Sequence, residues 1–300
     1  MSAFIKFLIR ILILTFVYFV LFSALSALLI PASIQTRSTE PNATVLLALL
    51  IVSVLNSLVL AYVIQRSRIG GWQLILNVFL VFFGVATFLP QIETAVFVES
   101  ISTRVLAGIV ASGLLLALFF SCLAVVVLGK RRSNVVELRR LNLSRSEWVL
   151  RVALLALCYV IIYFTFGYFV AWRNPAVRAF YHGTDPGNFF TQLGSVFLTT
   201  PWLPALQFIR GLLWILFALP LVRMMKGSWW EVGLAVALCF AVLPSSQLLI
   251  PNPIMPAEVR TAHLWETASS NFLFGWLVVV VLLRWRTSQR MQLADSPIRQ

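Results

Sequence analysis

The sequence predicts an all-α protein, a polytopic membrane helix bundle of about eight transmembrane helices, from two observations. Hydrophobic residues make up 60% of the 300 residues and charged residues only 11%, with a mean hydropathy of +0.94. This composition lies far outside that of water-soluble domains. Several apolar runs also reach about 18 to 25 residues, the length at which an α-helix crosses ~30 Å of hydrocarbon.

The first half, residues 1–129, is expected to contain four of these spans. Arg10 precedes the first apolar run, which is longer than the apolar core of a signal peptide and is therefore interpreted as a membrane anchor. Pro90 is expected to end the third span, because proline breaks a helix interior. Glu93 would then lie in a loop at 91–103. The expected spans of this half are 11–30, 44–64, 72–90 and 105–128.

Residues 130–147 are expected to form a basic cytoplasmic linker, and residues 148–286 a second set of four spans. A polar cytoplasmic tail follows at 287–300. Ser144 and Glu147 make a capping box for the fifth helix, because this spacing satisfies two free N–H groups at a helix start. The expected spans of this half are 148–171, 205–222, 230–250 and 257–283.

The outer loop between the fifth and sixth spans is expected to carry its own helix. Asp185 is a suitable N-cap and Pro186 a suitable first helical residue. Apolar side chains then recur at helical spacing until Pro201. This pattern predicts an amphipathic helix at 186–199 that lies on the outer membrane interface.

The distribution of basic residues predicts the orientation. Most of the 23 lysines and arginines fall on the side that holds both termini. Because such residues stay on the cytoplasmic side, we expect a cell-membrane protein with both termini in the cytoplasm. Its net charge of +13 is assigned to contact with anionic lipid headgroups on that side. No nucleic-acid partner is expected, because no basic helix outside the membrane is long enough to read a groove.

Three short matches favour an internal repeat of four plus four spans. The residues that open the matched stretches are Arg10 and Arg151, Gly71 and Trp229, and Leu123 and Leu277, at separations of 141, 158 and 154 residues. A parallel repeat of this kind would relate the halves by an axis along the membrane normal. The alternative is that apolar runs resemble one another by composition alone.

Polar side chains form a stripe along one face of the last span, and this stripe is the main candidate site. Its members are Arg260, His263, Glu266, Thr267, Ser270 and Asn271. If the repeat is real, the positions equivalent to Arg260, His263 and Glu266 in the first half are Leu106, Ile109 and Ser112. The ionisable groups would then belong to the last span alone. Because ionisable groups inside a membrane are costly, they indicate a functional site by default.

The leading hypothesis is a carrier or solute-binding protein for a small polar or ionic ligand. The stripe would line an outward-facing cavity closed by Glu93, Arg210 and the outer loop. In that loop, Arg178, His182 and Asp185 are the candidate residues. The structural alternative is that His263 and Glu266 bond each other and the rest of the stripe bonds neighbouring helices.

Two further functions remain open. His263 and Glu266 could serve an intramembrane enzyme as acid and base or as metal ligands. Since zinc needs three or four ligands and the second histidine is distant, neither a metal site nor a cofactor is predicted. The third hypothesis is an accessory or structural subunit whose stripe meets a partner membrane helix. The chain contains no Walker A or dinucleotide fingerprint.

Overall fold

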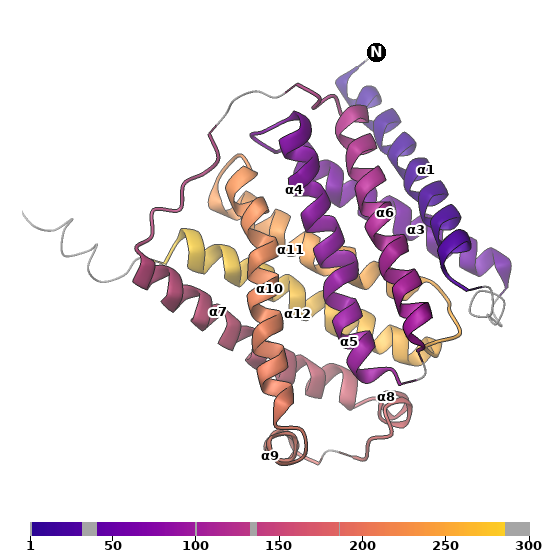
Figure 1. Ribbon diagram of the computed structural model, residues 1–300, viewed down its shortest axis with the longest axis vertical. Coiled ribbons are helices and arrows are strands. Elements are labelled where there is room, and N and C mark those ends of the chain that lie inside the picture. Colours follow the sequence, from indigo (N-terminus) through magenta and orange to yellow (C-terminus); the bar gives the residue numbers. More distant parts are fainter. Residues whose placement is uncertain (1, 32–40, 100, 133–136, 186, 286–300) are drawn as a thin grey trace, which may run out of the picture.

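The structure is a computed structural model that describes residues 2–31, 41–99, 101–132, 137–185 and 187–285 (Figure 1). Within these ranges, eight helices are long and apolar enough to cross a membrane, which confirms the predicted all-α membrane bundle. They are α1 (Ala3–Leu29), α3 (Asn42–Gln65), α4 (Gly71–Phe83) with its extension, α6 (Thr103–Val127), α7 (Arg145–Phe166) with its extension, α10 (Trp202–Met224), α11 (Trp229–Ser245) and α12 (Ala257–Leu283). The predicted tail at 287–300 lies outside the described ranges.

The eight helices form a closed ring of two layers. Helices α1, α6, α4 and α10 lie side by side in one layer, and α3, α11, α12 and α7 cross them in the other (Figure 1). The layers join at two edges, where α1 contacts α3 and α10 contacts α7. The helix that carries the polar stripe, α12, therefore lies between α11 and α7 in the interior of a layer.

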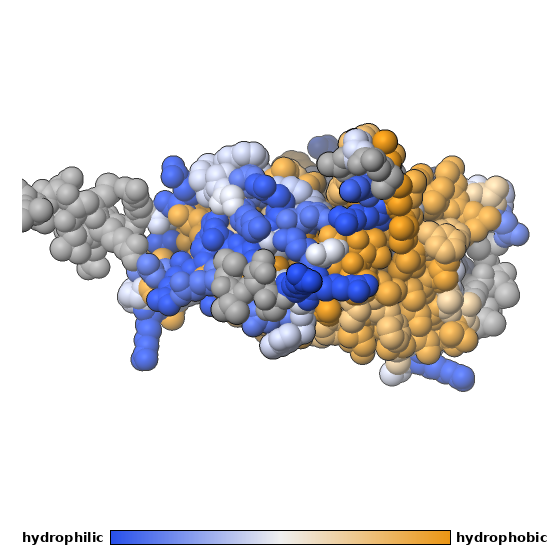
Figure 2. All heavy atoms as spheres, turned by 90° about the horizontal axis from the view of Figure 1, so that it is seen from above, coloured by the Kyte–Doolittle hydropathy of each residue, from blue (hydrophilic) through white to orange (hydrophobic). Residues whose placement is uncertain are grey.

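Apolar side chains cover much of the surface, as expected of helices that face lipid. Figure 2 shows hydrophilic residues gathered over one part of the molecule and a broad apolar surface beside them. Large exposed apolar side chains occur along the outward faces of α1 and α3, among them Leu12, Phe16 and Leu47. Exposed apolar area of this extent would drive aggregation in water but is satisfied by acyl chains.

The prediction that Pro90 ends the third span is wrong. A π-helical turn, η1 (Gly84–Phe88), leads without a break into α5 (Leu89–Phe97), so Glu93 lies on a helix and not in a loop. Proline offers no N–H to the carbonyl four residues earlier, which here belongs to Ala86. Gln247 Nε2 donates to that carbonyl at 3.0 Å. A side chain from η3 (Ser246–Leu249), the turn after α11, thus supplies the bond that the proline cannot make.

The outer loop differs from its prediction in where its helices begin. The amphipathic helix α9 (Phe189–Thr199) is capped by Asn188, whose side chain accepts from the Thr191 N–H at 2.9 Å. The predicted cap, Asp185, instead accepts from the Gly187 N–H at 2.9 Å, and Pro186 lies outside the described residues. An unpredicted short helix, α8 (Pro175–Phe180), follows the π-helical extension of α7, η2 (Gly167–Trp172).

The capping box at the start of the fifth span is confirmed. The Ser144 N–H donates to Glu147 Oε2 at 2.8 Å, and the Ser144 hydroxyl accepts from the Glu147 N–H. Because this box places the first helical residue at Arg145, α7 begins inside the segment 130–147 that was expected to be a linker.

Two aromatic clusters fill the core, one in each layer. The first consists of Tyr18, Phe82 and Phe120, and the second of Tyr159, Phe240 and Phe274. In each cluster the tyrosine meets the last phenylalanine edge-on, with ring centroids 5.3 Å apart in the first and 5.0 Å apart in the second. Edge-to-face contacts at this distance are the preferred geometry of aromatic pairs.

Two loops are joined at one end of the bundle. Residues 66–68, between α3 and α4, pair antiparallel with residues 224–226, between α10 and α11. The two backbone bonds, each 2.7 Å long, run from the Arg68 N–H to the Met224 carbonyl and from the Lys226 N–H to the Arg66 carbonyl. We call this pairing the loop hub. It joins the first half of the chain to the second half at this end of the bundle.

The contact between α11 and α12 depends on a glycine. A Cβ at Gly275 would lie 2.7 Å from Ala237 Cα on α11, too close for either backbone to accept without moving. We expect Gly275→Ala to lower the free energy of unfolding by about 1–3 kcal/mol, the usual cost of overpacking. The measurement is the unfolding midpoint of the detergent-purified protein. Gly194→Ala on α9, where nothing lies within 4 Å, is the matched control and should unfold as the wild type does.

Candidate functional site

The polar stripe of α12 faces the protein and not the lipid. Arg260 and Asn271 are buried, and His263, Glu266, Thr267 and Ser270 are partly buried. Helix α12 packs against α11, α7, η2 and α8, and these elements shield the stripe. A charge at mid-bilayer costs about 2.5–3.5 kcal/mol on insertion scales, so shielding of this kind is what allows the stripe to exist.

His263 lies at the centre of a hydrogen-bonded chain. Its Nδ1 lies 2.7 Å from Glu266 Oε2, one helical turn away, and its Nε2 lies 3.2 Å from the Tyr181 hydroxyl. Tyr181 ends α8, so this short outer helix brings the hydroxyl onto the stripe. With a carboxylate on one ring nitrogen and a hydroxyl on the other, the imidazole can hold or pass a proton at either end.

A second polar cluster joins α5 to α10. Arg210 Nη1 donates to Glu93 Oε1 in an ion pair and to Gln207 Oε1 at 2.7 Å. Arg210 is 3% exposed and Gln207 0%, and the guanidinium lies 5.9 Å from the Tyr159 ring centroid. Arg210 Nε and Gln207 Nε2 have no acceptor among the described residues. The charge of Arg210 is thus balanced by Glu93, but one N–H donor of Arg210 and one of Gln207 lack an acceptor among the described residues.

Carboxylates of both clusters act electrostatically on Tyr181. Burial raises the pKa of the Tyr181 phenol, and the carboxylates of Glu93 and Glu266 raise it further. Both carboxylates therefore act on one hydroxyl, which stays protonated at neutral pH and can donate. We call the combined set the outer polar cluster. Its members are Glu93, Tyr181, Gln207, Arg210, His263 and Glu266.

Some predicted site residues have other roles. Arg260 Nη1 donates to the Ile250 carbonyl at 2.8 Å and so supports the segment that precedes α12. Arg178 pairs with Asp185 at 3.6 Å and donates to the Trp172 carbonyl at 2.9 Å. These contacts fold the outer loop upon itself.

Sequence reasoning missed Tyr181 and Gln207. Gln207 could have been found, because it stands three residues before Arg210 and therefore on the same helix face. Tyr181 carries no such signal, since only the fold of the outer loop brings α8 against α12.

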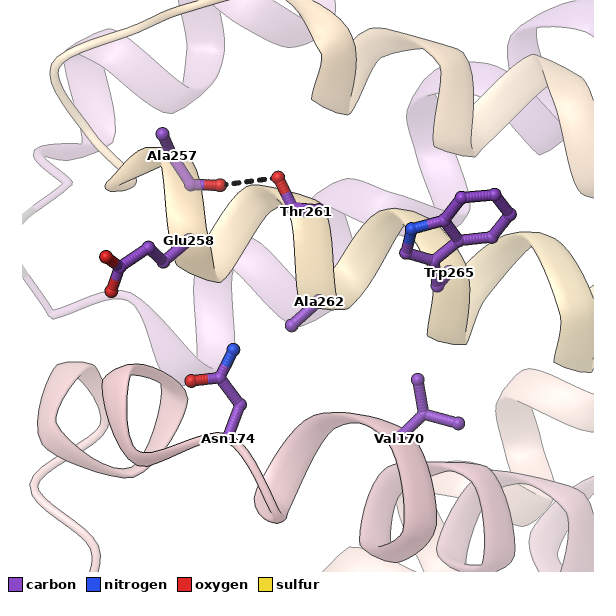
Figure 3. A pocket seen from close by; sticks show the side chains of 7 residues that line it. All are labelled: Val170, Asn174, Ala257, Glu258, Thr261, Ala262 and Trp265. Atoms are coloured by element: carbon purple, nitrogen blue, oxygen red, sulfur yellow. Dashed lines mark hydrogen bonds between the residues drawn. The ribbon is translucent and has the colours of Figure 1, made fainter.

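A hollow lies at the outer end of α12, beside the outer polar cluster. A groove of about 470 Å³ runs between the start of α12 and the end of the α7 span. It is lined by Val170, Asn174, Ala257, Glu258, Thr261, Ala262 and Trp265 (Figure 3). His263 and Glu266 are not among its lining residues.

The side chains of the cluster are able to exchange protons and to pair with charged groups. Among the residues that the structure describes, no three His, Cys, Asp or Glu side chains gather closely enough to hold a metal ion. Two carboxylates, one imidazole and one guanidinium can instead bind a polar solute and exchange protons with it.

Comparison of the chain with protein-family models, curated proteins and solved structures gives no match. The class of protein is therefore defined by the fold alone. Eight apolar helices make the chain a multi-pass membrane protein.

The ion pair between Glu93 and Arg210 is expected to contribute asymmetrically to stability. Glu93→Leu leaves a buried guanidinium without its counter-charge, so we expect a loss of about 3–5 kcal/mol. Arg210→Leu should cost less, because the Glu93 side chain is 35% exposed and can remain hydrated. The double replacement should recover much of the loss, since a hydrophobic pair can replace a buried ion pair. Unfolding midpoints in detergent measure all three.

Glu99→Leu is the matched control, because Glu99 is exposed beyond the end of α5. Equal costs for Glu93→Leu and Arg210→Leu, with no recovery in the double variant, would contradict a direct pairing.

Proposed function

We propose that the protein is a carrier or solute-binding protein of the cell membrane, with its site in the outer polar cluster. The observation that carries the proposal is the convergence of ionisable side chains from α5, α8, α10 and α12 inside a bundle of apolar helices. The solute is small and polar or ionic, and it contacts Glu93, Arg210, His263 and Glu266. Thr267, Ser270 and Asn271 continue the same face of α12 toward the middle of the membrane.

The energetics favour function over structural support. A buried ion pair stabilises a fold little more than a well-packed apolar pair would, because desolvation offsets the attraction. Apolar helices already fill the ring, so the bundle does not need two carboxylates, an imidazole and a guanidinium to hold together. Their retention is explained by a solute or a proton that uses them.

We propose the orientation with both termini in the cytoplasm, as the basic residues predict. The loop hub carries Arg66, Arg68 and Lys226 at the same end as Lys130, whose Nζ donates to the Ser67 carbonyl at 3.0 Å. Burial and the charge of Lys226 lower the pKa of Lys130. A concentration of like charges is favourable beside anionic headgroups of the inner leaflet. The outer polar cluster would then open toward the outside.

We further propose that the halves are related by a four-plus-four parallel repeat, and the ring order supports this. Exchanging α1 with α7, α3 with α10, α4 with α11 and α6 with α12 leaves every neighbour relation in the ring unchanged. The pairing in the loop hub also supports the repeat. Met225 follows Ser67 by 158 residues, the separation of the second sequence match, and equivalent residues can pair with each other only beside a two-fold axis.

Side chains support the same relation. Tyr159, Phe240 and Phe274 follow Tyr18, Phe82 and Phe120 by 141, 158 and 154 residues, the three separations of the sequence matches. Arg10 Nη1 donates to the Leu128 carbonyl at 3.5 Å, and Arg151 Nη1 donates to the Leu282 carbonyl at 3.4 Å. These contacts differ by 141 residues on the donor side and 154 on the acceptor side.

A repeat of this kind suits a carrier. Two similar halves joined at a hub can rock against each other and expose a site to either side in turn. The ionisable groups of α12 have no counterparts on α6, which carries Ile109 and Ser112 at the positions equivalent to His263 and Glu266. The solute site would thus belong to the second half, completed by Glu93 from the first.

The two other functions have less support. For an intramembrane enzyme, the His263 ring offers no open nitrogen, because Glu266 and Tyr181 occupy both. For an accessory subunit, the stripe would have to be open to a partner helix, whereas α7 and α8 already pack against α12.

The proposed function is tested by uptake into proteoliposomes. The probes are a radiolabelled panel of an amino acid, a monocarboxylate, a hexose and choline. We expect at least one to be taken up by the wild type and uptake to fall at least tenfold in the double variant His263→Leu/Glu266→Leu. Ser269→Ala is the control, since Ser269 is exposed on α12 and bonds the carbonyl of Trp265 in its own helix. Undiminished uptake by a folded double variant would refute the site.

The orientation is tested by cysteine labelling in cells. Single cysteines at Lys226, an exposed residue of the loop hub, and at Glu258, at the start of α12, are expected on opposite sides of the membrane. A membrane-impermeant maleimide added outside should label the cysteine at 258 and spare that at 226 until the cells are lysed. The reverse pattern would invert the proposed topology.

A further inference from the structure

The outer polar cluster contains two unused hydrogen-bond donors. Arg210 Nε and Gln207 Nε2 are buried and have no acceptor among the described residues. They lie close together, because the same guanidinium donates through Nη1 to the same amide through Oε1 at 2.7 Å. Buried donors are nearly always satisfied in native proteins, and leaving two adjacent ones unpaired is costly. A ligand with two adjacent oxygen acceptors would satisfy both.

We propose that the solute is a monocarboxylate, bound by Arg210 and Gln207 together with one proton. This inference rests on the proposed carrier function and names its substrate class. A carboxylate has two oxygens in one plane, and a guanidinium with a neighbouring amide offers donors that match them. The same two donors could also bond to the oxygen of a neutral amide. The charge of the ligand, and not its shape, therefore has to distinguish a carboxylate from an amide.

The charges around the site explain why a proton accompanies the solute. Helix α5 contributes Glu93, and α10 contributes Arg210. Helix α12 contributes His263 and Glu266, α7 contributes the phenols Tyr159 and Tyr163, and α8 contributes Tyr181. One permanent cation therefore faces two carboxylates already. A third carboxylate would be repelled in a medium of low dielectric unless one negative charge is removed.

Glu93 is the group that takes up the proton. Its side chain is 35% exposed, against 14% for Glu266, so water reaches it more easily. Once the proton forms an O–H bond on the Glu93 carboxylate, the ion pair with Arg210 is lost and Nη1 is released. The solute carboxylate then replaces Glu93 as the counter-ion of Arg210. The total charge of the cluster is the same before and after, since one anion and one proton enter together.

His263 and Glu266 keep their own bond in this scheme. Their 2.7 Å contact and the Tyr181 hydroxyl hold the opposite side of the site. Tyr181 stays protonated, because burial and both carboxylates raise its pKa. Its single O–H is then available to His263 Nε2, so Tyr181 orders the imidazole and does not have to contact the solute.

The experiment is direct binding to the purified protein in detergent. The probes are acetate, pyruvate and benzoate, with acetamide and benzamide as uncharged counterparts of the first and last. Affinity is measured by calorimetry at pH 5.5, 6.5 and 7.5. We expect at least one acid to bind, its amide to bind at least tenfold more weakly at pH 5.5, and affinity for the acid to fall up to tenfold for each unit of rising pH.

Three variants separate the roles. Glu93→Gln resembles the protonated carboxyl group and keeps an oxygen for Arg210, so its affinity should be high and independent of pH. Gln207→Leu removes one donor without changing charge, so affinity should fall about tenfold while the pH dependence stays. Arg104→Gln, which removes an exposed charge at the start of α6, is the control and should behave as the wild type does. Each variant is used only if it elutes as the wild type does in size-exclusion chromatography. If Glu93→Gln does not fold, the loss of affinity in Gln207→Leu tests the proposed binding by the two donors.

Equal binding of acids and amides, or acid binding that does not change with pH in the wild type, would overturn the proposal. If uptake of a different class of solute depends on His263 and Glu266 while no carboxylate binds, the proposed function stands and the substrate class is wrong. If no solute of the uptake panel is transported and none of the probes binds, both are wrong.

Discussion

The shielding of ionisable side chains from hydrocarbon is the constraint on which the structure of the outer half depends. Glu93, Arg210, His263 and Glu266 lie on three membrane-length segments, and each of them faces another polar group. A membrane has no water to repair a missing partner, so each such group has to be paired within the fold. This explains several features of the chain that look irregular from the sequence. The π-helical turn η1 carries α5 past Pro90 and brings Glu93 to α10, and the short helix α8 brings Tyr181 to α12.

The two ends of the bundle have different properties. At the loop hub, backbone bonds join the halves and basic side chains lie close to one another. At the other end, side chains of both signs form the outer polar cluster. Two halves that are joined at the loop hub could move apart and together at the opposite end, where the outer polar cluster lies. The proposed repeat would give this motion an axis, and the ionisable groups of α12, which have no counterparts on α6, would give it a single site.

Much of the fold could be predicted from the sequence, because hydropathy and length decide which segments can cross a membrane. All eight spans were placed by those two properties. Errors arose where tertiary contacts override a local rule. Pro90 does not end a helix because Gln247, far away in sequence, bonds the carbonyl that the proline leaves free. Asp185 and Asn188 are equally good caps by residue type, and only the structure shows that Asn188 is the one used.

The candidate site was predictable in part. The stripe on α12 follows from helical periodicity, and its burial agrees with the cost of exposing charge to lipid. The partners were harder to identify, because pairing between helices depends on packing that one sequence does not encode in a readable pattern. Glu93 and Arg210 were expected to close the same cavity, but their direct bond depends on the π-helical turn, and the contact of Tyr181 depends on the outer loop.

The most direct measurement is the environment of the stripe in a bilayer. A nitroxide spin label on a single cysteine at Thr267, in a variant without Cys122, Cys158 and Cys239, reports whether water or lipid surrounds this face of α12. If the stripe faces a polar site inside the protein, a water-soluble nickel complex will relax the label more strongly than oxygen does, and the effect of oxygen will be small. Strong relaxation by oxygen with none by nickel would place the face in acyl chains and contradict an internal site.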